Sequence, residues 1–153
     1  MPRRIFSVDE ANALLPLLEG VLRELEHVRD EIRRRRDHVA ILDALWGDKL
    51  MEPANPDHAE LLAHRDAIEA AAREIQRIVE DEISGRGIRF PQGGLEHGLL
   101  DFPTIWEGRW VYLCWRRGEP EVRAWHETDG GFAGRREITP EQRLRMGRDD
   151  ADA

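Results

Sequence analysis

Apolar residues recur at alternating steps of three and four over the first part of the chain. The series starts behind a Ser7–Glu10 capping box and continues to Trp46. This spacing is typical of a long helix with one apolar seam. Pro16 and Gly20 fall inside it, so we expect a kink, or a short helix followed by a long one. The seam consists of Ala11, Leu14, Leu18, Val21, Leu25, Val28, Ile32, Arg35, Val39, Leu42 and Trp46.

A second helix is predicted after a loop that contains one glycine and two prolines. Asn55 is its expected N-cap, Pro56 its first helical residue and Gly85 the residue that follows its end. Its apolar series is Leu61, Ile68, Ala72, Ile75, Val79 and Ile83. Two antiparallel helices with facing seams form a helical hairpin.

Charged residues interrupt both predicted seams, at Arg35 and Arg65. Because burial of an unpaired charge is costly, we expect both near the loop end, reaching solvent or a carboxylate such as Asp43 or Glu60. The four arginines at 33–36 are expected to form a solvated face paired with neighbouring acids. The helical histidines are also expected to face solvent: His27, His38, His58 and His64.

The hydrophobic period changes in the second half of the chain, where three strands are predicted at 99–102, 110–115 and 122–126. The expected turns are Glu107-Gly108 and Gly118-Glu119. The predicted fold class is therefore α+β, a long antiparallel helical hairpin followed by a small antiparallel β-sheet. The expected division is 1–85 for the hairpin, 86–138 for the sheet packed on it, and 139–153 for a short helix and a disordered tail.

The two turns predict a register for the sheet. The first places Asp101 opposite Cys114, and the second places Cys114 opposite Arg123. Asp101, Cys114 and Arg123 then form a row on one face, flanked by Tyr112 and Trp125. The opposite face is entirely apolar: Leu100, Phe102, Val111, Leu113, Trp115, Val122 and Ala124.

The mixed face predicts a small-molecule site. Its ligand-binding candidates are Asp101, Tyr112, Cys114, Arg123 and Trp125, because aromatic walls, a carboxylate, a thiol and a guanidinium are typical of such pockets. Arg123 would anchor a small anionic or polar ligand, and Cys114 would be a contact or a nucleophile. The alternative is structural, an Arg–Asp pair above Cys114 as a small buried apolar residue. No catalytic residue and no cofactor is assigned.

A metal site is the weaker hypothesis for the same region. The residues of suitable ligand type are His97, Asp101, Cys114, His126 and Glu127. The chain has neither CxxC nor HExxH spacing. The predicted register puts Cys114 and His126 on opposite faces, whereas it would let His97 converge with Asp101 and Cys114.

Composition narrows the class of protein. The chain has 153 residues and a net charge of −8, which argues against non-specific binding to nucleic acid. No apolar run approaches the length of a membrane-spanning helix, and the N-terminal residues do not resemble a signal peptide. Cys114 is the single cysteine, so no internal disulfide can form, and we expect a cytoplasmic protein.

Several segments resemble the bacterial family catalogued as domain of unknown function 2203 (DUF2203). They are IFSVDEANALLP at 5–16, GLLDFP at 98–103, VYLCWR at 111–116 with Gly118-Glu119, WHE at 125–127 and GFAGR at 131–135. The resemblance covers nearly the whole chain, although in the helical middle only the general character of the residues is similar and no specific motif matches. It implies no activity, but it directs attention to the strands.

Three functions follow from these features. The leading hypothesis is an interaction or scaffold module that forms a homo-oligomer, such as a homodimer, through its coiled-coil hairpin or binds a protein partner. The alternative is a small-molecule-binding protein or enzyme that uses the face around Asp101, Cys114 and Arg123. The second alternative is a metal-binding protein or a transcription-associated hairpin protein, by analogy with Gre-type factors. In that case the tip carboxylates would suit Mg²⁺: Asp43, Asp48, Glu52 and Asp57.

Overall fold

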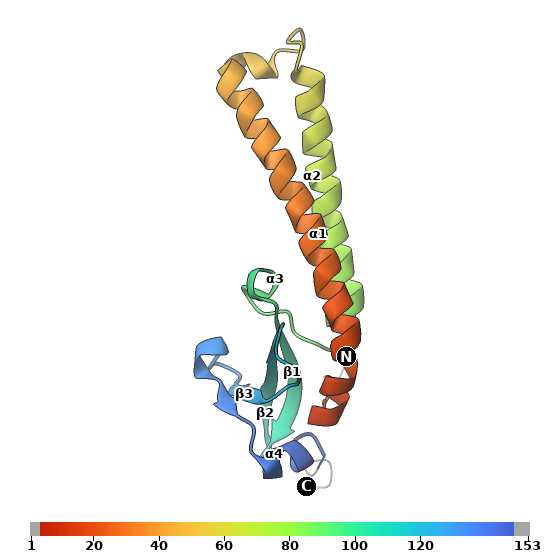
Figure 1. Cartoon of the computed structure of the whole chain (residues 1–153), viewed down its shortest axis with the longest axis vertical. Coiled ribbons are helices and arrows are strands. Elements are labelled where there is room, and N and C mark those ends of the chain that lie inside the picture. The colour runs from red at the N-terminus through yellow and green to blue at the C-terminus, as the bar shows by residue number, and fades with distance from the viewer. Residues whose placement is uncertain (1–3, 149–153) are drawn as a thin grey trace. The chain divides into compact units, whose positions relative to one another are not determined.

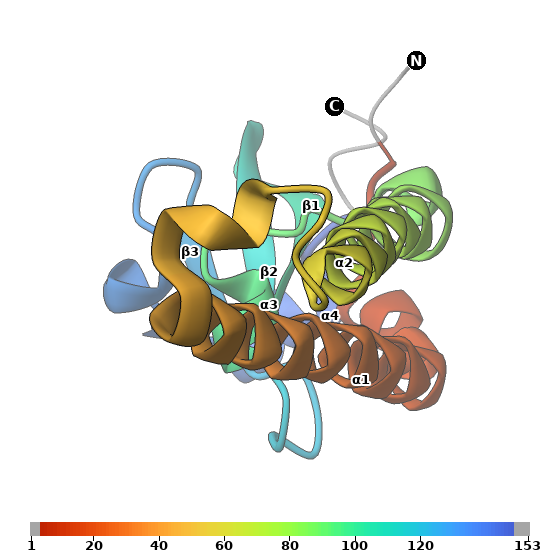
Figure 2. The ribbon, with the colours of Figure 1, turned by 90° about the horizontal axis from the view of Figure 1, so that it is seen from above.

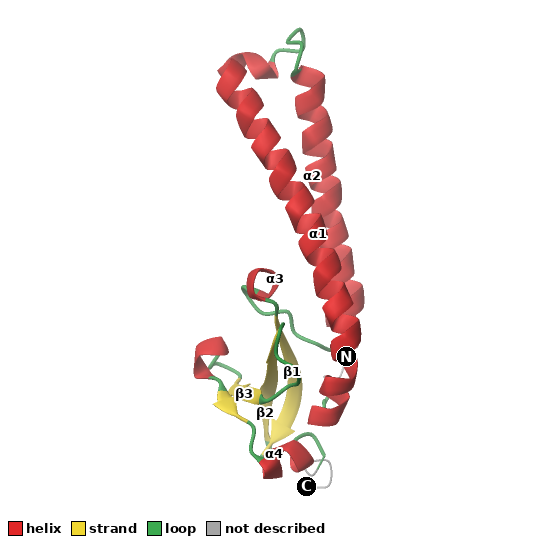
Figure 3. Cartoon of the chain, viewed as in Figure 1, coloured by secondary structure: helices red, strands yellow, loops and turns green. Residues whose placement is uncertain are grey.

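The computed structural model describes residues 4–148 of the chain, and this part has an α+β fold. Two long helices and a four-stranded sheet account for most of it (Figures 1 and 3). The elements are α1 (Val8–Trp46), α2 (His58–Ile78), α3 (Gly94–His97), β1 (Leu99–Trp106), β2 (Arg109–Arg116), β3 (Ala124–Glu127), β4 (Arg136–Glu137) and α4 (Pro140–Arg145). The tail at 149–153, expected to be disordered, lies outside the described residues.

The described chain divides into two compact units. The hairpin unit is Arg23–Ile78, and the sheet unit comprises the described residues up to Leu22 together with those from Val79 onward. Helix α1 therefore contributes its first turns to the sheet unit and its remainder to the hairpin unit. The domain boundaries expected at residues 85 and 138 remain a prediction.

Helix α1 begins where the sequence predicts. The Ser7 hydroxyl accepts a hydrogen bond from the backbone N–H of Glu10, and the N–H of Ser7 donates to Glu10 Oε1, both at 3.1 Å. This pair is the predicted capping box. The helix continues unbroken through Pro16 and Gly20, so the expectation of two separate helices is wrong. Pro16 lies on the exposed side, where water can solvate the carbonyl that loses its helical partner.

Helix α2 lies alongside α1 in the hairpin unit, as the two views in Figures 1 and 2 agree. A small core near the tip holds them together, formed by Leu42, Leu50 and Leu61 with Val39 and Trp46 packed against it. The α2 seam is Leu61, His64, Ile68, Ala71, Ile75 and Ile78. Relative to the prediction, the lower part of the seam uses Ala71 instead of the exposed Ala72, and Arg65 faces solvent beside His64.

The ends of α2 differ from the prediction. The helix begins at His58, and the first intrahelical bond runs from Leu61 N–H to the carbonyl of Asp57, so Asp57 rather than Asn55 starts it. Its end is followed by a π-helical turn at Val79–Ile83. The left-handed residue that closes this region is Gly87, with φ of 84°, instead of Gly85.

The sheet is antiparallel in the order β1-β2-β3-β4. The turn between β1 and β2 is Glu107-Gly108, and both residues have positive φ, 51° and 73°, which is the type I′ geometry of a two-residue hairpin. The predicted pairing of Asp101 with Cys114 is therefore confirmed. On the core face, the rings of Phe6 and Phe102 meet edge to face with centroids 5.3 Å apart.

The register between β2 and β3 differs by one residue from the prediction. A tight turn forms at Arg117-Gly118, closed by a hydrogen bond from Glu119 N–H to the Arg116 carbonyl. Pro120 has no N–H to donate to a ladder, and the N–H of Val122 donates instead to Asn12 of α1. The chain therefore rejoins the sheet only at β3.

The consequence is that Cys114 pairs with Ala124 instead of Arg123. Because side chains alternate along a strand, Trp125 moves to the core face beside its partner Leu113. His126 takes the opposite side and shares the face of Cys114.

Candidate functional site

Three neighbouring strands bring a carboxylate, a thiol and an imidazole together. Asp101 on β1 and Cys114 on β2 are direct partners, and His126 on β3 lies diagonally across from Cys114. The Nε2 atom of His126 is 3.1 Å from Oδ1 of Asp101. One carboxylate oxygen, the Cys114 Sγ and one ring nitrogen all lie within 4.8 Å of one another. All three residues are buried, and at most 4% of the His126 and Asp101 side chains is exposed.

The hydrogen bonds of His126 fix its protons. Its Nδ1 lies 2.6 Å from the carbonyl oxygen of Glu127, and because a carbonyl only accepts, Nδ1 carries a hydrogen. A hydrogen bond from Nε2 to Asp101 then needs a second proton on the ring. Burial lowers the pKa of His126, but the hydrogen bonds to Asp101 and to the Glu127 carbonyl outweigh it, so the pKa is raised. Without a metal, and at pH values below this raised pKa, His126 is an imidazolium paired with Asp101.

The thiol of Cys114 is held in its neutral form. Burial and the nearby Asp101 carboxylate raise its pKa to about 12, although the charge of Arg135 opposes them. A thiol with this pKa is a poor nucleophile at neutral pH. The hypothesis of a reactive Cys114 therefore loses its electrostatic support, whereas a metal ion would displace the proton directly.

A cleft of about 160 Å³ opens onto two of the three residues. Asp101 and Cys114 line it together with Arg89, Pro91, Gln92, Leu99, Gly131 and Phe132. The guanidinium of Arg89 stands over the ring of Tyr112, 4.8 Å from its centroid. The lining of the cleft therefore combines two polar side chains, those of Asp101 and Cys114, with the cationic side chain of Arg89.

The predicted ligand-binding residues separate in the structure. Arg123 lies just before β3, is 57% exposed and pairs with Glu119 at 3.7 Å, so the row Asp101–Cys114–Arg123 is wrong. Trp125 lies on the opposite face, with the guanidinium groups of Arg109 and Arg136 at 6.0 and 5.2 Å from its ring centroid. Tyr112 does keep its place on the predicted face, next to His126 at 5.6 Å between ring centroids.

The residues predicted as metal ligands are also separated in the structure, where three of the five lie together. His97 is on α3 and lies near Glu96, outside the group around Cys114. Glu127 forms hydrogen bonds with Arg109. The one-residue shift at Pro120 thus exchanges His97 for His126 as the third member of the cluster.

Two arginines near the site had not been singled out from the sequence as candidates. Arg135 donates to both carboxylate oxygens of Glu119, at 2.8 and 2.9 Å, and to the carbonyl of Cys114. Arg135 belongs to the GFAGR segment at 131–135, and this is the feature of the sequence that could have pointed to it. Arg89 precedes the sheet and pairs with Asp101 through the backbone, a contact that no pattern in the sequence marks.

The tip carboxylates that would suit Mg²⁺ under the Gre-type analogy do not gather into a group of three among the described residues. Among residues 4–148, the two groups with metal-compatible spacing are Asp101, Cys114 and His126, and His38, Glu60 and His64. Asp57 instead accepts a hydrogen bond from the Trp46 indole at 2.7 Å. None of the tip carboxylates belongs to either group.

Comparisons with known proteins bear on identity. No helix among the described residues has the length and apolar character to cross a membrane. Searches of curated proteins and of solved structures gave no significant match. A model of uncharacterised conserved proteins, DUF2203, matches residues 4–138, which include both long helices and all four strands. The chain belongs to the DUF2203 family.

Proposed function

We propose that the sheet unit binds a divalent transition metal, Zn²⁺ above others, through Asp101, Cys114 and His126. The observation that carries this proposal is the convergence of three different ligand types within 4.8 Å in a buried site. Tetrahedral Zn²⁺ ligands are about 3.3–3.8 Å apart, given bond lengths of ~2.0–2.3 Å. Small rotations of the three side chains would bring them to that spacing.

The chemistry of the donors favours zinc over hard cations. A thiolate and an imidazole suit Zn²⁺, whereas Ca²⁺ and Mg²⁺ prefer oxygen ligands alone. The Nδ1–H of His126 donates to a backbone carbonyl, which is the outer hydrogen bond that a metal-binding histidine commonly makes. That bond leaves Nε2 as the ligand atom, on the side of Asp101.

The cleft supports an open coordination site. Three protein ligands leave one tetrahedral position for water or a small molecule, the arrangement typical of catalytic zinc. Asp101 and Cys114 form part of the cleft wall, so the fourth position would face it. A free thiol ligand also fits the reducing cytoplasm expected from the single cysteine.

Titration with Co²⁺ tests the site. Because Cys114 is the only cysteine, a thiolate-to-Co²⁺ charge-transfer band would report this site alone. We expect the band to appear at a stoichiometry of one, Zn²⁺ to abolish it, and Cys114→Ser to remove it. Asp101→Asn and His126→Ala should weaken binding by roughly 100-fold or more, exceeding the 10- to 100-fold typical of outer-shell changes.

The matched control is His97→Ala, which removes an exposed histidine outside the cluster and should leave the titration unchanged. Zn²⁺ in large excess should also raise the melting temperature of the wild-type chain, because a ligand that binds the folded state stabilises it. Absence of both the charge-transfer band and the Zn²⁺ stabilisation would contradict the proposal.

A second candidate function is self-association through the hairpin. Ile41 and Leu45 lie one turn apart on α1 and are 58% and 66% exposed, and Leu62 on α2 is also exposed. Exposed aliphatic side chains of this size near each other are typical of interaction surfaces. A second copy of the chain is the partner that we propose.

The double variant Ile41→Glu, Leu45→Glu is expected to convert an oligomer into a monomer, because two carboxylates would have to be desolvated in the interface. Sedimentation velocity measures this change. Leu17→Glu is the matched control, since Leu17 is an exposed leucine of α1 outside the hairpin unit. A wild-type chain that stays monomeric at high micromolar concentration would rule out this function.

A further inference from the structure

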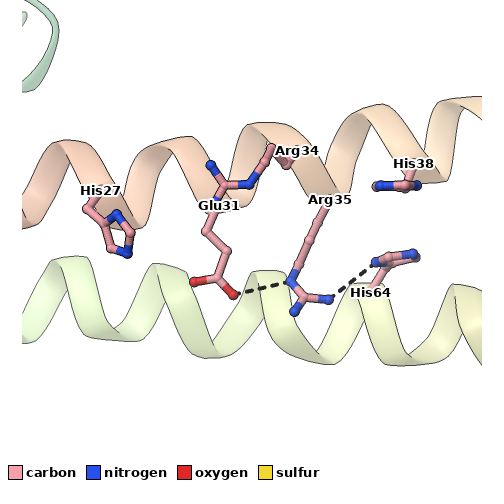
Figure 4. A pocket seen from close by; sticks show the side chains of 6 residues that line it. All are labelled: His27, Glu31, Arg34, Arg35, His38 and His64. Atoms are coloured by element: carbon pink, nitrogen blue, oxygen red, sulfur yellow. Dashed lines mark hydrogen bonds and ion pairs between the residues drawn. The ribbon is translucent and has the colours of Figure 1, made fainter.

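The hairpin unit contains a hollow of about 430 Å³ between its two helices. Figure 4 shows the side chains that line it, which are His27, Glu31, Arg34, Arg35, His38 and His64. Five of these six are arginine or histidine, although the chain as a whole has a net charge of −8. The two arginines outnumber the single carboxylate, Glu31, and the histidines add ring nitrogens that can donate hydrogen bonds, a combination that favours an anion.

Arg35 is fixed at the centre of the hollow. It donates from Nε to Glu31 Oε1 and from Nη1 to His64 Nδ1, both at 3.3 Å (Figure 4). Arg35 therefore reaches a carboxylate, as expected, but that of Glu31 instead of Asp43 or Glu60. His64, which was expected to face solvent, instead takes a place in the seam, with 13% of its side chain exposed.

This contact determines the tautomer of His64. An arginine has no acceptor, so Nδ1 of His64 must accept and the ring proton resides on Nε2. The Nε2 atom is buried and has no hydrogen-bond partner, and its nearest carboxylate oxygen, in Glu60, lies 3.4 Å away. The imidazole of His38 stacks on the same ring, with centroids 5.3 Å apart and planes 10° from parallel.

The tautomer distinguishes between two kinds of ligand. His38, Glu60 and His64 have ligand atoms within 4.8 Å of one another, a spacing that would suit a metal ion. A metal at Nε2 would move the ring proton to Nδ1, where it would oppose the donor of Arg35. An acceptor ligand requires no such change, because Nε2–H remains a donor that forms no hydrogen bond, although a Glu60 oxygen lies 3.4 Å away.

We propose that the hairpin hollow binds a small phosphate-type oxyanion. Arg34 supplies the exposed cationic anchor, since within residues 4–148 it forms no ion pair or side-chain hydrogen bond. Arg35, His38 and His64 supply further donors from both helices. Phosphate oxygens match the planar donor set of arginine. A free phosphate is favoured over a nucleic-acid backbone, because the acidic chain would repel a long polyanion.

The test uses the full chain with a metal chelator present, so that the sheet unit contributes no metal-dependent signal. Pyrophosphate is titrated by calorimetry and by thermal unfolding, with a single-stranded oligonucleotide as the second arm. Pyrophosphate should bind and raise the melting temperature, whereas the oligonucleotide should do neither. Arg34→Ala and His38→Gln should weaken pyrophosphate binding by roughly 10- to 100-fold, the range for hydrogen bonds to charged groups.

Arg33→Ala and Arg36→Ala are matched controls, because they remove the same charge from exposed positions outside the hollow. They should bind pyrophosphate like the wild type, and so should Arg89→Ala in the sheet unit. Equal loss in Arg33→Ala and Arg34→Ala would show non-specific attraction and overturn the proposal. Absence of pyrophosphate binding, or binding of the oligonucleotide alone, would overturn it as well.

Discussion

Replacing His126 with alanine is expected to lower the free energy of unfolding of the metal-free protein by roughly 3–5 kcal/mol. The substitution leaves the Asp101 carboxylate buried without its partner, 3.1 Å away in the wild type. A buried charge that loses its counter-charge is poorly solvated, so the loss exceeds the net value of the pair itself. The cavity left by the imidazole adds to the cost.

Urea denaturation of the chelated protein measures this effect. His97→Ala is the control, since an exposed surface substitution should change stability by no more than about 0.5 kcal/mol. The double variant Asp101→Asn, His126→Ala should recover part of the loss, because the carboxylate that was left unpaired is then neutral. A cost below about 1 kcal/mol for His126→Ala would contradict the buried imidazolium–carboxylate pair.

The sequence predicts the parts of this fold that depend on local signals. Ser7 and Glu10 start α1 because their side chains satisfy backbone groups within one helical turn. Glu107-Gly108 sets the first hairpin because a two-residue loop with positive φ allows only one register. The apolar seam of α1 is also predicted correctly, because the same spacing of apolar residues repeats over many helical turns.

The errors arise where a distant contact decides a local choice. After β2, a hydrogen bond from Val122 to Asn12 and the missing N–H of Pro120 shift the chain by one residue. The pure apolar face favoured the other register, since nothing in the local sequence shows that Trp125 belongs to the core face. This shift of one residue in the register of β3 decides whether Arg123 or His126 lies beside Asp101 and Cys114.

The hairpin contains a comparable one-residue error. Arg65 and His64 are adjacent, and either fits the spacing of the α2 seam between Leu61 and Ile68. The structure places His64 there because Arg35 on α1 can donate to its Nδ1, whereas two facing arginines would repel each other. Such pairing between helices cannot be derived from the pattern of one helix alone.

The metal affinity proposed for the sheet unit is expected to rise steeply with pH. The pKa of the Cys114 thiol is raised to about 12 by burial and by Asp101. The pKa of His126 is raised above its ordinary value of 6.5. Both groups are therefore protonated in the metal-free protein near pH 6, and a metal ion must displace one proton from each. Each displaced proton contributes about a tenfold change in affinity per pH unit, so below the raised pKa of His126 the affinity should increase about 100-fold per pH unit.

Above the raised pKa of His126 the slope should fall to about tenfold per pH unit, because only the thiol proton is then displaced. Competition between Co²⁺ and a chelator of known affinity measures the slope, and calorimetry in two buffers of different ionisation enthalpy counts the protons released. Asp101→Asn removes the charge that helps to raise the pKa of His126 and leaves only a neutral acceptor for its Nε2–H, so the change of slope should move to lower pH. A pH-independent affinity, or binding without proton release, would show that the metal is held by carboxylates elsewhere on the acidic surface and that Cys114 and His126 keep their protons.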